Sequence, residues 1–258
     1  VNPEKYSVNN ISATMNILNA AVKHGCLRFV FSSSAAVYGS PEYLPIDEKH
    51  PKNPESYYGF TKLKTEEFLQ WYDRLKGLKF ASLRYFNAAG YDPSGAVKGL
   101  ERNPQNLLPI IMEVAAGMRK ELQIFGNDYP TRDGTCIRDY INVVDLAQAH
   151  IAALKRLLDG KVESKEIFNL GTGEGTSVLE LINKFEQATG VKVPYDIVGR
   201  RAGDIEAIWA DPQKANKILK WKTEVSLEDT LLSAWNWQRY TMDKDKSAKR
   251  HFSFLSVS

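Results

Sequence analysis

The chain has 258 residues, 43% of them hydrophobic and 25% charged, which suits one sizeable globular domain or two small ones. Its formal net charge is only +3 and no long basic block precedes the C-terminal end, so nucleic acid is not an expected partner. Two cysteines, Cys26 and Cys136, and four histidines without metal-like spacing predict neither a disulfide framework nor a metal site. No apolar run is long enough for a membrane span and no secretory leader is recognisable, so we expect a cytoplasmic protein without membrane partners.

The first elements alternate between helix and strand. Helical spacing of apolar residues predicts a helix over residues 8–24, and a short buried strand over 27–31 follows. A long helix is predicted over 57–76 and a strand over 80–85. Strand, helix and strand at these lengths indicate parallel pairing with a right-handed crossover. Residues 1–90 are therefore predicted to form the latter part of a doubly wound sheet.

The second half begins with a loop rich in Gly, Pro and Asn over residues 92–105, and loops of that length are usually functional. Helices are predicted over 107–118, 145–158, 177–189, 212–219 and 227–240, and strands over 122–125, 167–170 and 194–198. We expect residues 91–240 to be mainly a substrate-binding region and residues 241–258 a loosely ordered tail. The predicted fold class is α/β, a partial doubly wound, Rossmann-like parallel sheet with a smaller C-terminal α/β domain.

Three residues suggest proton-transfer chemistry. Tyr58 and Lys62 are four positions apart, which places both on one face of a helix. An ammonium beside a phenol favours the phenolate, so we expect Lys62 to lower the pKa of Tyr58 towards neutrality. Ser34, at the end of the preceding strand, can hydrogen-bond the same substrate oxygen. The trio predicts a site for oxidation and reduction of an alcohol.

The segment Gly171 to Thr176, GTGEGT, follows a predicted strand and precedes a predicted helix, as a dinucleotide loop would. Its spacing is G-x-G-x-G instead of G-x-G-x-x-G, and it lies far from the first strand of the fold. We therefore expect a strand-to-helix turn in which Thr176 or Ser177 caps the helix.

Several longer motifs resemble one family. FSSSAAVYG from Phe31, YYGFTK from Tyr57, LRYFNAAG from Leu83, IFGNDYPTRDGTCIRDYI from Ile124 and RRAGD from Arg200 are similar to the UDP-galactose 4-epimerases (UDP-glucose 4-epimerases), which are extended short-chain dehydrogenases/reductases. The similarity extends to about Gln238. The family also has an N-terminal portion with the glycine-rich loop, so the chain is expected to be the C-terminal part of a longer protein and to show no turnover by itself.

The resemblance implies an NAD-dependent isomerase, UDP-glucose 4-epimerase (EC 5.1.3.2), that interconverts UDP-galactose and UDP-glucose in galactose metabolism. Tyr58 would take the proton of the sugar 4-hydroxyl while hydride passes to NAD, and the 4-keto sugar would receive the hydride back on its other face. Ser34 would share the hydrogen bond to that oxygen, and Lys62 would tune Tyr58. The family also implies a homodimer formed through helices flanking the catalytic one.

The resemblance also implies binding residues. The matches to cofactor-contacting positions are Asn10, Ser32, Tyr58, Lys62 and Tyr85. The matches to positions around the nucleotide sugar are Ser34, Asn87, Asn106, Leu107, Gln123, Phe125, Arg138, Tyr140, Arg201 and Asp204. Two guanidiniums, Arg138 and Arg201, can clamp a diphosphate through forked hydrogen bonds, and Phe125 offers an apolar wall to uracil. Arg200 is expected at the surface, and the histidines are expected to be structural or exposed.

Three alternatives stay open at this point. Ile208 occupies a position where relatives carry Tyr or a small residue, so acceptance of UDP-N-acetylglucosamine is undecided. A nucleotide-sugar 4,6-dehydratase is disfavoured because Ser34 is followed by Ala35 and Ala36, which supply no carboxylate. The chain could also be a non-catalytic scaffold that keeps the fold without the cofactor.

Overall fold

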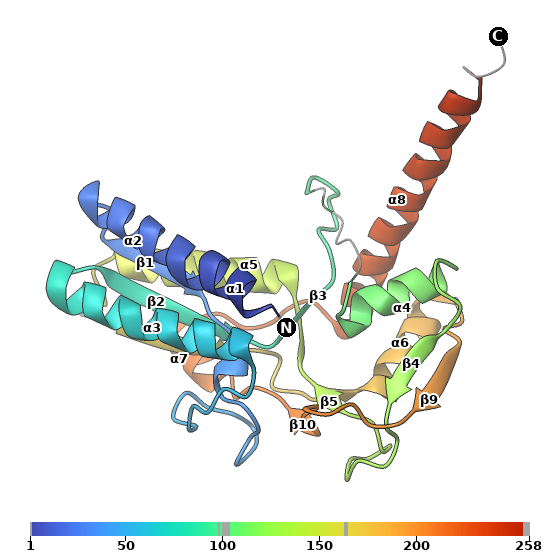
Figure 1. Ribbon diagram of the computed structural model, residues 1–258, viewed down its shortest axis with the longest axis horizontal. Helices are drawn as coiled ribbons and strands as arrows, with labels where there is room; N and C mark the ends of the chain where they lie inside the picture. Colours follow the sequence, from blue (N-terminus) through green and yellow to red (C-terminus); the bar gives the residue numbers. More distant parts are fainter. Residues whose placement is uncertain (1, 98, 100–103, 163–164, 255–258) are drawn as a thin grey trace.

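The computed structural model describes residues 2–97, 99, 104–162 and 165–254, with side chains described up to residue 242. Its central sheet has the strand order β1-β2-β7, and both pairings are parallel. The strands span Arg28–Ser32 (β1), Lys79–Tyr85 (β2) and Lys165–Leu170 (β7). The sheet thus joins segments from both halves of the chain, because β7 returns from the second half to pair with β2 (Figure 1).

Helices cover both faces of this sheet (Figure 1). Phe80 of β2 packs in a cluster with Leu18 of α2 (Ala13–Lys23) and Leu69 of α3 (Tyr57–Lys76). Ala81 and Leu83 of the same strand are also buried, but they pack with α5 (Val143–Leu158) and α7 (Gln213–Leu219). Since side chains alternate between the faces of a strand, α2 and α3 lie on one face and α5 and α7 on the other. This is the predicted doubly wound arrangement.

The predicted helix over residues 8–24 has a more complex form. It consists of the short helix α1 (Pro3–Tyr6), a π-helical segment η1 (Ser7–Ser12) and α2. Within η1 the side-chain amide of Asn10 donates to the Thr61 hydroxyl at 3.0 Å, which fastens the segment to α3. π-Helical turns occur often at functional sites, and apolar periodicity does not reveal them.

The second half builds smaller sheets around its own core. The parallel pairs are β3 (Asn87–Ala89) with β6 (Tyr140–Asn142), and β4 (Leu122–Phe125) with β9 (Tyr195–Val198). A third sheet has the order β10 (Ala207–Ile208), β5 (Ile137–Arg138), β8 (Thr176–Ser177). Helices α4 (Leu107–Ala115), α6 (Val178–Thr189) and α8 (Leu227–Phe254) pack around a core that includes Ile111, Phe185 and Trp235.

The longer predicted elements are confirmed, with α3 and β4 at the predicted bounds. The two-residue and three-residue strands β3, β5, β6, β8 and β10, and the 3₁₀ turn η2 (Ala35–Val37), were not predicted, because their pairing partners lie far away in the sequence. The predicted tail is corrected in one respect: α8 continues to Phe254, through a stretch without Gly or Pro that would interrupt a helix. Among the described residues no helix is long and apolar enough to cross a membrane.

A capping box starts α6, as the serine and glutamate in its sequence allow. The Ser177 hydroxyl accepts from the Glu180 amide at 3.1 Å, and the Glu180 carboxylate accepts from the Ser177 amide at 2.9 Å. Arg132 also pairs with Glu180. Hydrogen bonds from the Arg132 guanidinium, aided by the Ser177 amide, lower the pKa of Glu180 to about 2. The predicted turn with Ser177 as its cap is therefore confirmed.

The lowered pKa of Glu180 predicts an acid-sensitive contribution to stability. The contribution is fully present at pH values above the ordinary glutamate pKa of 4.5, and it is lost as the pH falls towards the lowered pKa of about 2. We expect the free energy of unfolding, measured by urea denaturation, to fall less between these pH values in Glu180→Gln than in the unmodified chain. Glu67→Gln, which removes an exposed carboxylate paired with Lys64, is the control and should leave the pH dependence unchanged. Equal pH dependence in Glu180→Gln and the unmodified chain would contradict the assignment.

Candidate active site and nucleotide-sugar pocket

The structure brings Ser34, Tyr58 and Lys62 together at the carboxyl end of β1. Ser34 follows β1 and caps η2 through a 3.1 Å hydrogen bond from the Ala36 amide to its hydroxyl. Tyr58 lies in the first turn of α3, which Ser56 caps, and the Ser34 hydroxyl is near enough to act on its pKa. The Lys62 ammonium lies 5.5 Å from the centre of the Tyr58 ring. The predicted proximity of the three side chains is confirmed.

The electrostatics of the trio differ from the expectation. Burial raises the pKa of Tyr58, and the hydrogen bond from Ser34 only partly opposes this rise. Burial also lowers the pKa of Lys62. The Lys62 ammonium donates to the Ser32 carbonyl at 2.9 Å. Desolvation is the largest cause of the shift at Tyr58, so its pKa in this structure is raised, which is opposite to the predicted net lowering towards neutrality.

A buried ion pair anchors the elements that carry the trio. Arg84 of β2 and Glu66 of α3 are only 1% exposed each, and the Arg84 Nε donates to Glu66 Oε1 at 2.9 Å. The Ser33 hydroxyl donates to the same carboxylate oxygen at 2.6 Å. Arg84 also donates to the Tyr38 hydroxyl at 2.9 Å, and that hydroxyl donates to Asn169 at 2.6 Å. This network fixes α3 and the residue before Ser34 to the central sheet.

The predicted cofactor positions gather at the same end of the sheet, with one exception. Ser32, Lys62 and Tyr85 are all half-buried, and the Ser32 hydroxyl is near enough to Tyr85 to act on its pKa. Open α/β sheets bind nucleotides at the carboxyl ends of their strands, so these donors and acceptors suit the nicotinamide end of a dinucleotide. The side chain of Asn10 instead bonds Thr61. Its cofactor role stays a prediction.

Nine of the predicted substrate residues line one pocket of about 670 Å³. They are Asn87, Asn106, Leu107, Gln123, Phe125, Arg138, Tyr140, Arg201 and Asp204. The lining also includes residues that the sequence did not single out, among them Ile110, Cys136 and Val178. Ser34 belongs to the neighbouring trio, and Asn87, two residues beyond Tyr85 at the end of β2, connects the trio to the pocket. The pocket has the size of a small-molecule site.

Charged and aromatic groups face one another in this pocket. The Arg201 guanidinium lies 5.1 Å from the centre of the Phe125 ring and pairs with Asp204 at 2.7 Å. Arg138 donates to the carbonyl of Ile137 at 2.9 Å. Two guanidiniums in one pocket create a site suited to a diphosphate. Arg200 is exposed as predicted and pairs with Asp128.

The glycine-rich segment serves a buried carboxylate instead of a phosphate. Asp139 accepts hydrogen bonds from the amides of Thr172 at 2.8 Å and Gly173 at 3.3 Å, and from the Ala210 amide at 3.1 Å. A Cβ on Gly171 would lie 2.3 Å from the Asp139 carboxylate, so glycine is needed for this close approach. The segment is a turn that fixes Asp139, and with it the neighbouring Arg138.

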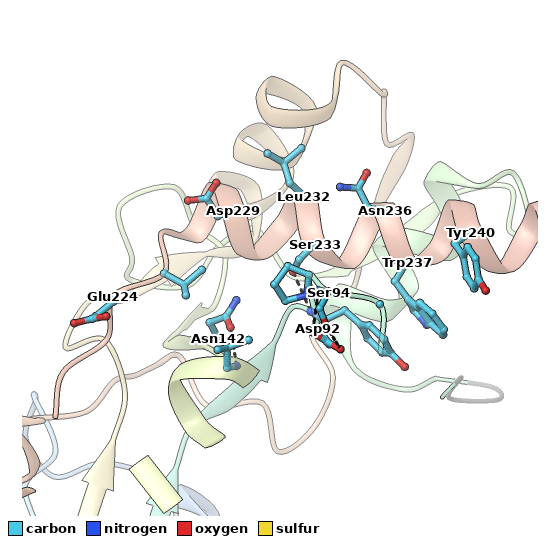
Figure 2. A pocket seen from close by; sticks show the side chains of 15 residues that line it. Asp92, Ser94, Asn142, Glu224, Asp229, Leu232, Ser233, Asn236, Trp237 and Tyr240 are labelled. Carbon is cyan, nitrogen blue, oxygen red and sulfur yellow. Dashed lines mark hydrogen bonds between the residues drawn. The ribbon is translucent and has the colours of Figure 1, made fainter. Parts of the chain in front are cut away.

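A larger pocket of about 900 Å³ lies elsewhere, between α8 and the loop that begins at Tyr91 (Figure 2). Asp92, Asp229 and Asn236 are among its polar lining residues, and Tyr91 stacks on Trp237 with ring centres 4.3 Å apart. Its lining contains none of the predicted site residues. Asp92 is already bonded to Ser94 and to the Val97 amide, which fold its loop. We assign the site to the smaller pocket.

The Arg84–Glu66 pair predicts a strongly non-additive stability effect. Glu66→Leu or Arg84→Met alone leaves a buried charge without its partner and should lower the free energy of unfolding by about 3–5 kcal/mol. The double variant should recover at least half of that loss. Urea denaturation measures the free energy of unfolding of the two single variants and of the double variant. Glu67→Ala, at an exposed ion pair, is the control and should lower the free energy of unfolding by less than about 1 kcal/mol. Additive losses would contradict the analysis.

Comparison with known proteins identifies the relatives. A family model described as GDP-mannose 4,6 dehydratase matches residues 1–233. The UDP-glucose 4-epimerase of Bacillus subtilis is 44% identical over 250 residues, which cover 96% of this chain and 73% of that protein. UDP-glucose 4-epimerase 2 of Oryza sativa subsp. japonica is 47% identical over 240 residues, which cover 91% of this chain but 58% of that protein. The chain therefore spans roughly three fifths to three quarters of the length of these relatives.

Solved structures agree with the sequence matches. The UDP-glucose 4-epimerase of Stenotrophomonas maltophila, solved with bound NAD and formylated UDP-arabinopyranose, has a TM-score of 0.90 at 44% identity and covers 94% of this chain and 72% of its own. The enzyme of Bifidobacterium longum, in complex with NAD⁺ and UDP, has a TM-score of 0.85 at 42% identity, with coverage of 92% and 71%. The family resemblance of the motifs is thereby confirmed: the chain belongs to the UDP-glucose 4-epimerase family.

Proposed function

We propose that the protein containing this chain is an NAD-dependent UDP-glucose 4-epimerase, which inverts carbon 4 of a UDP-linked hexose. The observation that carries the proposal is the single pocket that gathers nine residues matching nucleotide-sugar positions, next to the trio of Ser34, Tyr58 and Lys62. The relatives with 44% and 47% identity are epimerases of this kind.

Tyr58 is the group that exchanges a proton with the sugar 4-hydroxyl. The Ser34 hydroxyl is near enough to act on the pKa of Tyr58, so Ser34 can share the hydrogen bond to the substrate oxygen. Bound NAD would supply the oxidation and reduction of carbon 4. Ser32, Lys62 and Tyr85 are the residues of this chain that would hold its nicotinamide end, and Asn10 is proposed to contribute to that site from η1.

Arg138 and Arg201 bind the diphosphate, and Asn87 and Tyr140 contact the nucleotide sugar from the same pocket. Phe125 supplies a flat wall for the uracil, and Asp204 accepts from ribose hydroxyls. The Asp204 carboxylate already accepts from Arg201, so a diphosphate and Asp204 compete for the same guanidinium. Asn106, Leu107 and Gln123 complete the lining.

A 4,6-dehydratase is the function that the name of the family model suggests, but the site does not favour it. Ser34 is followed by Ala35 and Ala36, and the nearby Glu66 carboxylate is buried against Arg84. Water elimination needs an acid and a base at the neighbouring carbons, and the trio offers no free carboxylate for this task. A scaffold without catalysis is the remaining alternative, and it predicts UDP binding without turnover.

Ile208 bears on the choice of sugar. Its side chain is 7% exposed and packs with Val37, Phe86 and Ala210, and its strand β10 pairs with Arg138 of β5. It fills space beside the site and does not line the pocket. We propose UDP-galactose and UDP-glucose as the substrates, and whether UDP-N-acetylglucosamine is accepted is a question for measurement. The division into residues 1–90, 91–240 and 241–258 and the cytoplasmic location stay predictions.

We also propose that the protein forms a homodimer through α2 and α3, which lie side by side (Figure 1). Phe60, Trp71 and Leu75 share one face of α3, and Trp71 and Leu75 are 56% and 69% exposed. Ile17 on α2 is 56% exposed as well. A second copy that covers this face would bury large apolar groups that otherwise contact water.

Replacement of the proposed proton-transfer group tests the activity. Tyr58→Phe keeps the ring but removes the hydroxyl, so we expect turnover of UDP-galactose with NAD to fall by at least ~100-fold. Tyr57→Phe is the matched control, because the Tyr57 hydroxyl bonds Ser7 at 2.7 Å outside the trio, and it should leave turnover unchanged. Both the 258-residue chain and the complete reading frame that contains it are assayed. Near-normal turnover in Tyr58→Phe would exclude Tyr58 as the acid and base.

A charge on the exposed face of α3 tests the dimer. Trp71→Glu places a carboxylate where the partner is proposed to pack, so sedimentation velocity should show a dimer converted to a monomer. Ile197→Glu, at a 41% exposed position on β9, is the control and should remain dimeric. A monomer before any substitution, or a dimer that tolerates Trp71→Glu, would refute this interface.

A further inference from the structure

Ser32, the last residue of β1, is contacted from both faces of the central sheet. Its carbonyl accepts from the Lys62 ammonium of α3 at 2.9 Å, and its hydroxyl lies 2.8 Å from Nε2 of His150 on α5. Val30, two residues earlier on the same side of β1, packs in the cluster of α5. Ser32 is therefore the point at which the catalytic helix and the helix on the opposite face are linked.

The protonation pattern of the His150 ring follows from its second contact. Nδ1 lies 2.8 Å from the carbonyl oxygen of Leu146, which can only accept a hydrogen bond. Nδ1 must therefore carry a hydrogen. In the neutral ring Nε2 is then an acceptor, and the Ser32 hydroxyl donates to it. The hydrogen bond between Ser32 and His150 has a defined direction.

Tyr85 lies beside this pair of hydrogen bonds. Its ring centre lies 6.4 Å from that of His150, and the nearby Ser32 hydroxyl lowers the pKa of Tyr85 against the larger rise that burial causes. The order of donation is Ser32, His150 and the Leu146 carbonyl.

We propose that His150 is a positioning residue of the active site, which holds Ser32 so that the Ser32 carbonyl meets the ammonium of Lys62. The catalytic consequence rests on the proposed function. Lys62 lies in a half-buried site where burial disfavours its charge and lowers its pKa, and the Ser32 carbonyl accepts a hydrogen bond from its ammonium. Loss of the bond to His150 would free the end of β1 and weaken the hold on Lys62.

Two substitutions at His150 separate positioning from packing. Glutamine can accept from Ser32 through its side-chain oxygen, whereas leucine fills a similar volume but cannot accept. The first measurement is the ¹⁵N resonance of the Lys62 ammonium in lysine-labelled chain, assigned with Lys62→Met. We expect His150→Leu and Ser32→Ala to shift this resonance, and His150→Gln to return it towards the unmodified position. His24→Leu, at the end of α2, is the control and should not move it.

The second measurement is the kinetics of the complete protein. His150→Leu should lower kcat about tenfold with KM unchanged, His150→Gln should restore most of it, and Ser32→Ala with His150→Leu should be no worse than either alone. If His150→Leu lowers only the melting temperature, and leaves the Lys62 resonance and kcat unchanged, His150 merely packs α5 on the sheet and the proposal is overturned. Absence of epimerase activity in the unmodified protein would refute the proposed function, while the Lys62 resonance would still decide the role of His150.

Discussion

The buried pair of Arg84 and Glu66 is the interaction on which the geometry of the active site depends. Its two charges come from β2 and α3, and the cost of burying either one alone would be large. The pair can exist only with α3 in one rotation and one axial position against the sheet. Lys62 lies one helical turn before Glu66, so the same constraint sets Lys62 and, one turn further, Tyr58. Ser33 bonds the same carboxylate and places Ser34 opposite them.

A second buried carboxylate organises the pocket in a comparable way. The Asp139 carboxylate accepts hydrogen bonds from amides of the glycine-rich turn and of the chain near β10, while burial raises its pKa. It lies between Arg138 and Tyr140, which both line the pocket. The carboxylate thus connects the turn before α6, β5 and β10 at one point.

Burial also determines the ionisation of the trio, and here local reasoning fails. A lysine four residues after a tyrosine suggests a stabilised phenolate, because only the two charges are considered. In the folded chain both groups lose water, which raises the pKa of Tyr58 and lowers that of Lys62. The neutral phenol is the favoured ground state in this structure. His150 illustrates the same limit, since its sequence neighbours give no sign of its bond to Ser32, more than a hundred positions away.

The sequence by itself determined the long elements and their α/β class and, through the family motifs, predicted the trio and nine of the residues that line the pocket. Apolar periodicity marks the long helices such as α3, and the family motifs carry the site residues as types and spacings. The tertiary structure alone decided what depends on distant neighbours. It placed β7 beside β2, formed the short strands β3 and β6, assigned the glycine-rich turn to Asp139 and set the sign of the pKa shifts. Strand pairing and the desolvation of a buried group both depend on residues that folding brings together from distant parts of the chain. A short stretch of sequence does not include those residues, so it cannot predict either effect.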